Sequence, residues 1–397
     1  MKIDVEKFLN RKENLFSKDF KINEKLINKE IKKSKFLIIG AAGSIGQAVT
    51  TEIFKKHPKK LHLVDISENN MVELVRSLRS SSGYISGEFK TFEIDVDSIE
   101  FEKLYKKQSY DYIFNFSALK HVRSEKDPYT LMRLFKVNIL NPLKIIQLSK
   151  NKKIKKFFNV STDKASEPAN MMGASKRLME ISLISKSRNI PVVLARFANV
   201  LFSDGSLLSG FKYRLEKNQP LSVPKDIKRY FITSKESAYL CIMTAIFGDK
   251  NQIFYPKIQN HKNLISFSNL AIKFLKLNKL RPIFSKTENS ARKFSKINKN
   301  KNQWPCYLFS SDTTGEKEEE IFYSKNDKLN TTKFNDIGII TNAISKQELK
   351  KINLFIKNLK QYSKKDKWKK KELINIVKKT LKNFNYIDKK KYLNEKM

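Results

Sequence analysis

The sequence predicts an α/β fold: a doubly wound parallel sheet with a smaller lobe and a helical C-terminal extension. Apolar strands alternate with helices from residue 35 to about 200, which is typical of parallel sheets. A glycine-rich turn follows the first strand at 40–46, and an Asp-Lys pair follows a later strand at 163–164. Parallel sheets hold ligands at the carboxyl ends of their strands, so both motifs are expected to lie at a ligand site.

The elements follow one another regularly in the first half of the chain. Residues 1–34 are expected to form a helical arm, and one long helix is expected over 131–149. The strands and helices predicted around the two motifs are a strand at 36–39, a helix at 44–55, a strand at 61–64, a strand ending near 95, a strand at 112–116 and a strand at 157–160.

The second half of the chain predicts three further regions. After a main domain at 35–200, short apolar segments interrupted by prolines predict a substrate-covering lobe over 201–293. A linker, read at Ser295–Gln303, and an extension are expected over 294–344. The tail at 345–397 is basic, with apolar residues at helical spacing that predict a packing helix: Leu349, Ile352, Phe355, Ile356 and Leu359. A contact with a membrane surface or a partner is the less favoured alternative.

Length and composition are those of an enzyme-sized globular chain. The 397 residues are 40% hydrophobic, which is sufficient for a full α/β domain and a second lobe. Apolar runs remain shorter than the ~18 residues of a membrane span, and no apolar leader is visible, so a cytoplasmic protein without a membrane span is expected. Cys241 and Cys306 lack metal-ligand spacing, so neither a disulfide framework nor a metal site is expected.

The formal charge of +40 has two interpretations. Clustered basic residues bind nucleic acid, but here lysine is spread from end to end, which favours a solvated surface and no nucleic-acid partner. A positive field also attracts a diphosphate substrate or an anionic membrane surface.

The glycine turn predicts a dinucleotide site. Gly40, Gly43 and Gly46 follow a strand and open a helix, where the backbone approaches a pyrophosphate and the helix N-terminus stabilises its charge. Asp65 ends the next strand, 19 residues beyond Gly46. A carboxylate there binds ribose hydroxyls and repels a 2′-phosphate, so NAD is favoured over NADP. The alternative is that Asp65 only caps the next helix.

Five phrases, with the glycine turn, resemble the extended short-chain dehydrogenase/reductase superfamily with its Rossmann sheet. Within it they resemble the soluble UDP-N-acetylglucosamine 4,6-dehydratases of the CapD-like polysaccharide biosynthesis family. The phrases are SALKHV at 117–122, STDKA at 161–165, MGASKR at 172–177, RFANV at 196–200 and RYF at 229–231. The resemblance extends from about Phe36 to Asn342.

The resemblance implies roles for individual residues. Asp163 would be the acid and Lys164 the base for C5, beside Thr162, while Lys176 would grip the nicotinamide ribose. Asn138 would be structural. The other residues implied in cofactor binding are Ser44 and Ile45 at the helix start, Asp95 and Val96 at the adenine, and Ser117, Ala118 and Leu119 near the nicotinamide ribose. Those implied in substrate binding are Asn199, Ser206 and Arg229 at the diphosphate, with Lys120 and His121 beside the sugar.

Met172 departs from the superfamily pattern, which has tyrosine at this place. Methionine has no proton to exchange, and some dehydratases of the same group share it. The base for the C4 hydroxyl is therefore open. We hypothesise that Asp163, or a water held by Thr162, takes that proton, with electrostatic help from Lys176.

The sequence thus predicts an NAD-dependent UDP-N-acetylglucosamine 4,6-dehydratase that supplies a 4-keto-6-deoxy sugar for surface polysaccharide or glycan synthesis. A nucleotide-sugar 4-epimerase, or a dehydratase of another nucleotide sugar, is the enzymatic alternative. A non-catalytic NAD-binding protein is the alternative from another class. A homo-oligomer, formed through a pair of helices, is expected from the resemblance, and the configuration at C5 of the product is left open.

Overall fold

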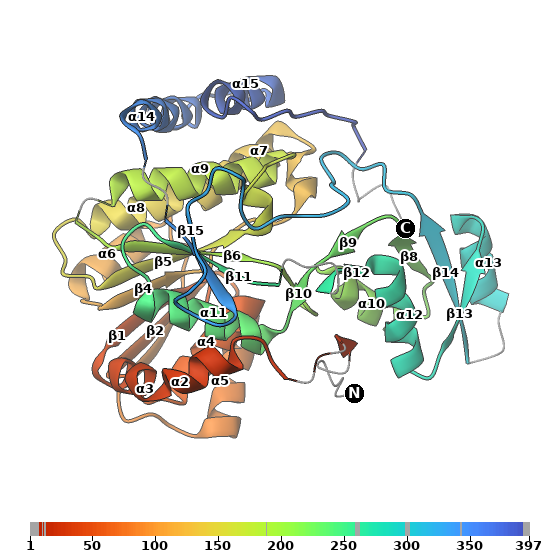
Figure 1. The fold of residues 1–397 in the computed structure, drawn as a ribbon, viewed down its shortest axis with the longest axis horizontal. Coiled ribbons are helices and arrows are strands. Elements are labelled where there is room, and N and C mark those ends of the chain that lie inside the picture. The colour runs from red at the N-terminus through yellow and green to blue at the C-terminus, as the bar shows by residue number, and fades with distance from the viewer. Residues whose placement is uncertain are drawn as a thin grey trace.

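The fold is centred on one large twisted sheet. A computed structural model describes residues 8–9, 11, 13–187, 189–258, 263–297, 302–341 and 344–391. Nine strands form the sheet in the order β15-β16-β11-β6-β5-β4-β1-β2-β3 (Figure 1). The strands are β1 Lys35–Ile39, β2 Lys60–Asp65, β3 Glu88–Glu93, β4 Tyr112–Asn115, β5 Lys156–Thr162, β6 Val192–Phe197, β11 Ile253–Pro256, β15 Leu329–Asn330 and β16 Ile337–Ile340.

The strand directions confirm the predicted fold class. From β3 to β11 every neighbouring pair is parallel, and only β16 and β15 add antiparallel strands at one edge. The order β3-β2-β1-β4-β5-β6 is that of a doubly wound sheet, whose ligands lie at the carboxyl ends of the strands.

Helices cover both faces of this sheet (Figure 1). On one face lie α2 Ser17–Ile22, α3 Glu24–Lys33, α4 Ser44–Phe54, α5 Glu68–Ser82 and α11 Ser234–Phe247. On the other lie α6 Ile99–Lys107, α7 Pro128–Phe135, α8 Asn141–Leu148 and α9 Met171–Lys186. The N-terminal arm packs on the domain, because Phe20 of α2 is buried and stacks on Tyr239 of α11 at 4.0 Å between ring centroids.

The single helix expected over 131–149 is wrong in one respect. A π turn at Lys136–Leu140 separates α7 from α8. Pro142 has no N–H to offer the carbonyl of residue 138, four positions earlier, so the regular α-helical bonding is broken there. The turn places the Asn138 side chain against the loop that follows β4.

The smaller lobe has its own sheet and core. Its strands, in the order β13-β14-β8, are β8 Leu221–Pro224, β13 Arg281–Ser285 and β14 Gln303–Phe309. Its helices are α10 Leu207–Glu216, α12 Phe267–Leu277 and α13 Glu288–Ile297. β14 pairs with both β8 and β13, so the division expected at 293 cuts through this sheet. The linker read at 295–303 also differs: residues 295–297 end α13, 303 starts β14, and 298–301 lie outside the described residues.

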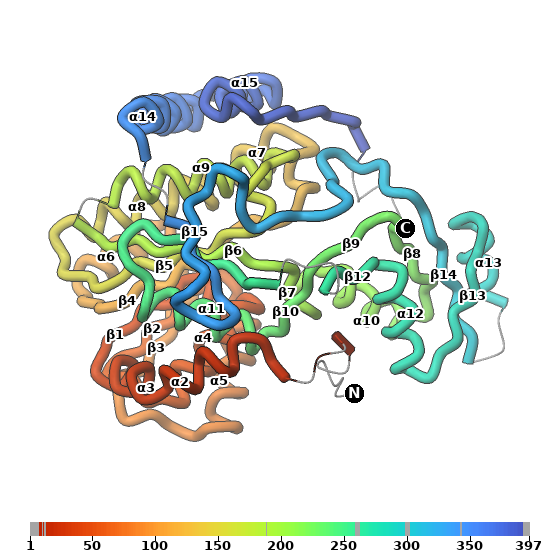
Figure 2. The backbone as a smooth tube through the Cα atoms, in the orientation of Figure 1, coloured from red at the N-terminus to blue at the C-terminus, as the bar shows by residue number. Residues whose placement is uncertain are grey.

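The C-terminal extension forms two helices, α14 Lys346–Tyr362 and α15 Lys370–Thr380. Helix α14 packs on α9, and α15 packs on α7 and α14. Ile352, Phe355, Ile356 and Leu359 are buried, which confirms the predicted packing helix. Figure 2 shows the chain beyond α15 turning back toward the segment that follows β14. None of the helices in the described ranges combines the length and apolarity needed to cross a bilayer.

Candidate active site

Asp163 and Lys164 lie at the carboxyl end of β5, as predicted. Thr162 caps the short 3-10 helix Asp163–Ala165 and donates its hydroxyl proton to Asp163 Oδ1 at 2.8 Å. Lys164 donates to the same oxygen from its backbone N, at 2.8 Å, and from Nζ, at 3.2 Å. Asp163 is 2% exposed, and its Oδ2 accepts no hydrogen bond from any described residue. One carboxylate oxygen is therefore held, and the other is left for a bound group.

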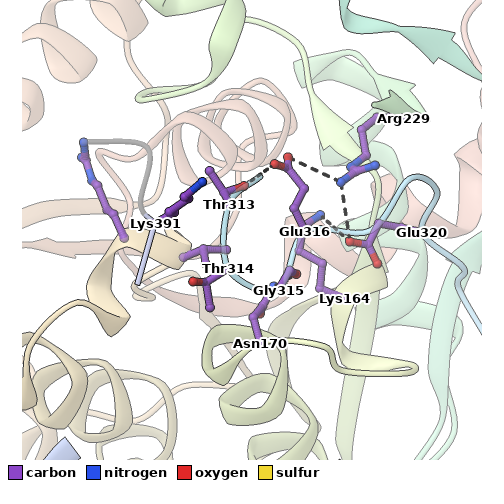
Figure 3. A pocket seen from close by; sticks show the side chains of 11 residues that line it. Lys164, Asn170, Arg229, Thr313, Thr314, Gly315, Glu316, Glu320 and Lys391 are labelled. Atoms are coloured by element: carbon purple, nitrogen blue, oxygen red, sulfur yellow. Dashed lines mark hydrogen bonds and ion pairs between the residues drawn. The ribbon is translucent and has the colours of Figure 1, made fainter. Parts of the chain in front are cut away.

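A cavity of about 50 Å³ adjoins this pair, with Lys164 and Arg229 in its wall (Figure 3). The rest of the wall is formed by residues 313–316 and by Glu320, which lies beside Arg229 and Lys164, with Lys391 at one side. Substrate sites usually measure roughly 300 to 1,000 Å³, so this space holds only a few waters. A nucleotide sugar that used this space would have to displace part of that wall.

Ion pairs link Lys164 and Arg229 to the rest of the cavity wall. Arg229 Nη2 lies 3.9 Å from a carboxylate oxygen of Glu316 and 3.9 Å from one of Glu320. Lys164 Nζ lies 3.9 Å from Glu320 Oε1. Burial raises the pKa of Glu320 and the charge on Asp163 adds to the rise, while Lys164 and Arg229 oppose it. Lys164 and Arg229 are therefore two cations of the site, and each is paired with at least one glutamate.

Lys176 faces back toward β5 from helix α9. Its Nζ donates to the carbonyl of Val160 at 3.1 Å, and the side chain is buried. Burial lowers the pKa of Lys176 to about 8, against the opposing influence of Glu180. The helix is positioned by Asn170, which caps its N-terminus and donates Nδ2–H to the carbonyl of Gly315 in the cavity wall at 2.9 Å.

Met172 is buried in the first turn of α9. Its backbone N donates to Glu125 Oε1 at 2.8 Å. Burial raises the pKa of Glu125 to about 7, although the amides of Met172 and Met171 oppose the rise. A protonatable carboxyl group therefore lies at the helix start where the superfamily pattern has a tyrosine.

Two glycines of the turn are required by the protein itself. Gly40 has φ +72°, and a Cβ there would lie 2.7 Å from the backbone N of Ser117. A Cβ on Gly46 would lie 2.1 Å from the carbonyl oxygen of Gly40. At Gly43 the nearest atom would be 3.5 Å away, so the protein's own packing leaves that glycine open to a ligand. Next to it, Ser44 begins α4, and its hydroxyl donates to Asp204 at 3.0 Å. Ile45 follows it, packed against the core.

Asp65 is tied to both the turn and the next helix. Its Oδ2 accepts from the backbone N of Ala42 and its Oδ1 from that of Ser67, each at 2.9 Å. Ser67 is the N-cap of α5, so Asp65 does contact the start of that helix, as the alternative interpretation of this residue predicted in part. A carboxylate has about four acceptor positions, which leaves room for ribose hydroxyls beside these two bonds.

The other residues expected at the cofactor line the same end of the sheet. Asp95 is exposed after β3 and Val96 is buried. Ser117, Ala118 and Leu119 follow β4 and are part-buried. Asn138 accepts from the N of Leu119 at 2.9 Å and donates to its carbonyl at 3.0 Å, which is the structural role expected of it.

The residues expected at the substrate differ in their surroundings. Arg229 reaches the cavity beside Lys164, whereas Ser206 caps α10. Asn199 lies in the short strand β7 Asn199–Val200, and no described residue accepts from its buried Nδ2. Lys120 is exposed, and His121 is part-buried, close enough to Gly205 that a Cβ there would clash with its ring. Burial, aided by Lys120 and Arg123, lowers the pKa of His121 to about 4, so its ring is neutral at pH 7.

Sequence reasoning did not find Glu316, Glu320, Asn170 or Lys391. Glu316 and Glu320 lie in the extension expected over 294–344, to which the sequence assigned no chemistry. The contact between Gly315 of this extension and Asn170 joins residues 145 positions apart, a distance at which no local pattern operates. Over the ranges that the structure describes, no group of three or more His, Cys, Asp or Glu side chains is arranged to hold a metal.

A model of the family described as "Polysaccharide biosynthesis protein" matches residues 36–342. The capsular polysaccharide biosynthesis protein CapD of Staphylococcus aureus is 30% identical over 262 residues, covering 64% of this chain and 42% of that protein. A UDP-glucose 4-epimerase of Rickettsia bellii is 26% identical over 232 residues, covering 56% of this chain and 65% of that one. The chain thus spans less than two thirds of either relative.

Two solved structures share the fold. Pen from Bacillus thuringiensis has a TM-score of 0.63 and 22% identity, covering 83% of this chain and 98% of its own. The Bordetella bronchiseptica enzyme WbmF, in complex with NAD⁺ and UDP, has a TM-score of 0.51 and 19% identity, covering 62% and 78%. At these identities the likeness establishes the fold.

Proposed function

The chain belongs to the polysaccharide biosynthesis protein family, and from this premise we propose that it is an NAD-dependent nucleotide-sugar 4,6-dehydratase acting on UDP-N-acetylglucosamine. The observation that carries the proposal is the Asp163–Lys164 pair, with one carboxylate oxygen unengaged, beside Arg229. The product would be a 4-keto-6-deoxy sugar for surface polysaccharide or glycan synthesis. The cytoplasmic location and the homo-oligomer stay predictions from the sequence.

The residues at the glycine turn fit a dinucleotide. Gly43 offers an open approach to the backbone at the N-terminus of α4, where a pyrophosphate is stabilised. Asp65 has acceptor capacity for ribose hydroxyls and disfavours a 2′-phosphate, so we propose NAD as the cofactor. The NAD⁺ complex of WbmF supports this choice. Bound NAD would supply the acceptor for a hydride from C4 of the sugar and the donor of a hydride to C6.

Asp163 and Lys164 supply the proton transfers of the elimination. Asp163 becomes a carboxylic acid when it takes the C4 hydroxyl proton, and Lys164, whose Nζ lies 3.2 Å from Asp163 Oδ1, acts as a neutral amine beside it. The amine then takes the C5 proton while the C6–O bond breaks, and the acid protonates the departing hydroxyl, which leaves as water. The proton on Lys164 returns to C5 when C6 is reduced.

The C4 hydroxyl proton needs an acceptor other than Met172. Thr162 donates to Asp163, so the hydroxyl and the carboxylate can pass a proton between substrate and pair. We assign this step to Asp163, directly or through a water held by Thr162, with Lys176 adding positive charge near the ribose.

A nucleotide-sugar 4-epimerase is the second candidate, favoured by the similarity to the Rickettsia epimerase. Epimerisation at C4 needs neither a C5 base nor a C6 acid, so it leaves the Asp163–Lys164 pair without a use. A non-catalytic NAD-binding protein, suggested by Met172, leaves both that pair and Arg229 unexplained.

Proton NMR of the purified protein with UDP-N-acetylglucosamine and NAD tests the proposal. We expect a new C6 methyl signal, and the H4–H5 region then reports retention or inversion at C5. Accumulation of the C4 epimer without a methyl signal would support the epimerase instead. No change with any nucleotide sugar, despite bound NAD, would favour the non-catalytic protein.

Asp163→Asn should lower the rate of methyl formation by about 100-fold or more, because general acid–base groups contribute roughly that much. The matched control is Asp249→Asn, at a side chain that is 73% exposed and belongs to the turn before β11. Near-normal turnover of a folded Asp163→Asn protein would remove both the acid and the proposed C4 proton acceptor.

A further inference from the structure

Glu320 is a buried carboxylate in the site that the proposed chemistry does not use. It is 4% exposed, and its Oε1 lies 3.9 Å from Lys164 Nζ and 3.9 Å from Arg229 Nη2 (Figure 3). Lys164 therefore lies between two carboxylates, Asp163 at 3.2 Å and Glu320 at 3.9 Å. A surface glutamate with only a solvation role would not be enclosed in this way.

The segment that carries Glu320 is fixed to the main sheet. Two residues on, the carbonyl of Phe322 accepts from Arg196 Nη1 at 2.6 Å, and the Phe322 ring is fully buried against Tyr230 and Tyr255. Arg196 is itself held by a bidentate bond to Glu180, at 2.9 and 2.8 Å. This buried network gives Glu320 a defined place, as a positioning group requires.

We propose that Glu320 is a positioning residue that holds Lys164 in place and sets the proton occupancy of the Asp163–Lys164 pair. The inference rests on the dehydratase function proposed above and names a further residue of the same site. Glu320 need not touch the sugar, because it acts through Lys164.

Charged groups from several elements face Glu320. Asp163 repels it, while Lys164, Arg229 and Lys317 attract it. Glu316 competes for Arg229. A negative charge beside the pair favours the protonated forms of both Lys164 and Asp163. Removing that charge makes each group lose its proton at a lower pH.

Loss of the Glu320 charge should change the pH dependence of turnover in a defined direction. Lys164 has to be deprotonated to take the C5 proton, and Asp163 has to be ionised to take the C4 hydroxyl proton, so each group sets an acid limb of the pH–rate profile. Without the charge of Glu320 both limbs move to lower pH. A residue with a merely structural role would lower the rate without moving the limbs.

The experiment compares the pH dependence of kcat and kcat/KM for the full-length wild type, E320Q and E319Q, following methyl formation. We expect E320Q to move both limbs down by about one pH unit or more, the usual effect of a charge within ~4–6 Å. E319Q is the matched control, because Glu319 is 34% exposed and pairs with Lys228 instead of Lys164. Its limbs should stay in place.

Four outcomes separate the hypotheses. Unmoved limbs in E320Q, with or without a lower rate, would overturn the inference. E320D keeps the charge, so the inference would also fail if the limbs of E320D moved as far as those of E320Q. Circular dichroism and UDP titration check that E320Q folds. If it does not, E320A also removes the charge and should show the same shift. If the wild type itself makes no methyl product, the dehydratase function has failed, independently of any variant.

Discussion

At the scale of single residues, the burial of the charged side chain of Lys176 has a cost in stability that can be measured. Lys176 donates to the carbonyl of Val160 and is the only buried cation that the sequence assigns to the cofactor. Its pKa is lowered to about 8, which means that the lysine holds its proton less tightly in the folded protein than in the unfolded chain. A buried lysine of this kind costs stability, and buried groups with shifted pKa values are found mainly at functional sites.

Replacement of Lys176 by methionine should therefore stabilise the cofactor-free protein while weakening NAD binding. Below pH 8 the wild-type lysine is protonated in both states and carries the full penalty, about 3 kcal/mol for the drop from 10.5. Between pH 8 and 10.5 the unfolded chain holds more protons than the folded one, so wild-type stability rises with pH and the advantage of methionine fades. Urea unfolding at pH 7 and 9.5 measures this difference.

The control is Lys186→Met, at the exposed end of the same helix, which should show no pH-dependent gain. Destabilisation of Lys176→Met by the same amount at both pH values would mean that the lysine is not a penalty in the apo protein.

At the scale of elements, the wall of the cavity depends on the end of the described chain. Thr314 donates its backbone N–H to the carbonyl of Lys391 at 3.0 Å, and its hydroxyl oxygen accepts from the N of Lys389 at 3.2 Å. Lys391 Nζ also donates to Asp312 at 2.9 Å. Lys389 and Lys391 lie beyond residue 342, where the family match stops. The cavity wall is therefore held by a segment outside the family region.

Ending the chain at Asp388 should strengthen substrate binding without unfolding the protein. It removes three hydrogen bonds, each worth about 1 kcal/mol, that hold the wall a nucleotide sugar has to displace, so we expect the KM for UDP-N-acetylglucosamine to fall by about tenfold or more. The matched control ends at Lys391 and keeps all three. Equal KM values for the two chains would show that the tail does not position the wall.

At the scale of the whole molecule, α14 and α15 cover α9 and α7 and complete the core on that side of the sheet (Figure 1). Phe355 is 1% exposed in this contact, while its neighbour Leu354 is 58% exposed. The surfaces of α7 and α9 that these helices cover are not available to the homo-oligomer expected from the sequence.

Phe355→Asp should detach α14 from α9, because it places a charge in an apolar contact after removing a large ring. Truncation of a buried phenylalanine alone costs about 3 to 5 kcal/mol. Leu354→Asp, the matched control, should change the unfolding free energy by less than about 0.5 kcal/mol. Thermal unfolding and light scattering check both variants, and an unaltered Phe355→Asp protein would show that α14 contributes nothing to the core.

The sequence alone determined the parallel sheet, the glycine turn and the placement of Asp163 and Lys164 at a strand end. These features depend on patterns within a few residues: strand and helix periodicity, glycine at a tight turn, and a polar pair after an apolar strand. Pro142 is also a local signal for the break between α7 and α8.

Only the tertiary structure decided which distant residues meet this site. It brought Glu320 to Lys164, Gly315 to Asn170 and Lys391 to Thr314, and it added β14 to the sheet of the smaller lobe. Such contacts depend on how whole layers pack after loops have closed, and no periodicity in the chain specifies them. The Asp163–Lys164 pair could be predicted locally because it lies within one turn, whereas the carboxylate proposed to control its protons comes from the far end of the family region.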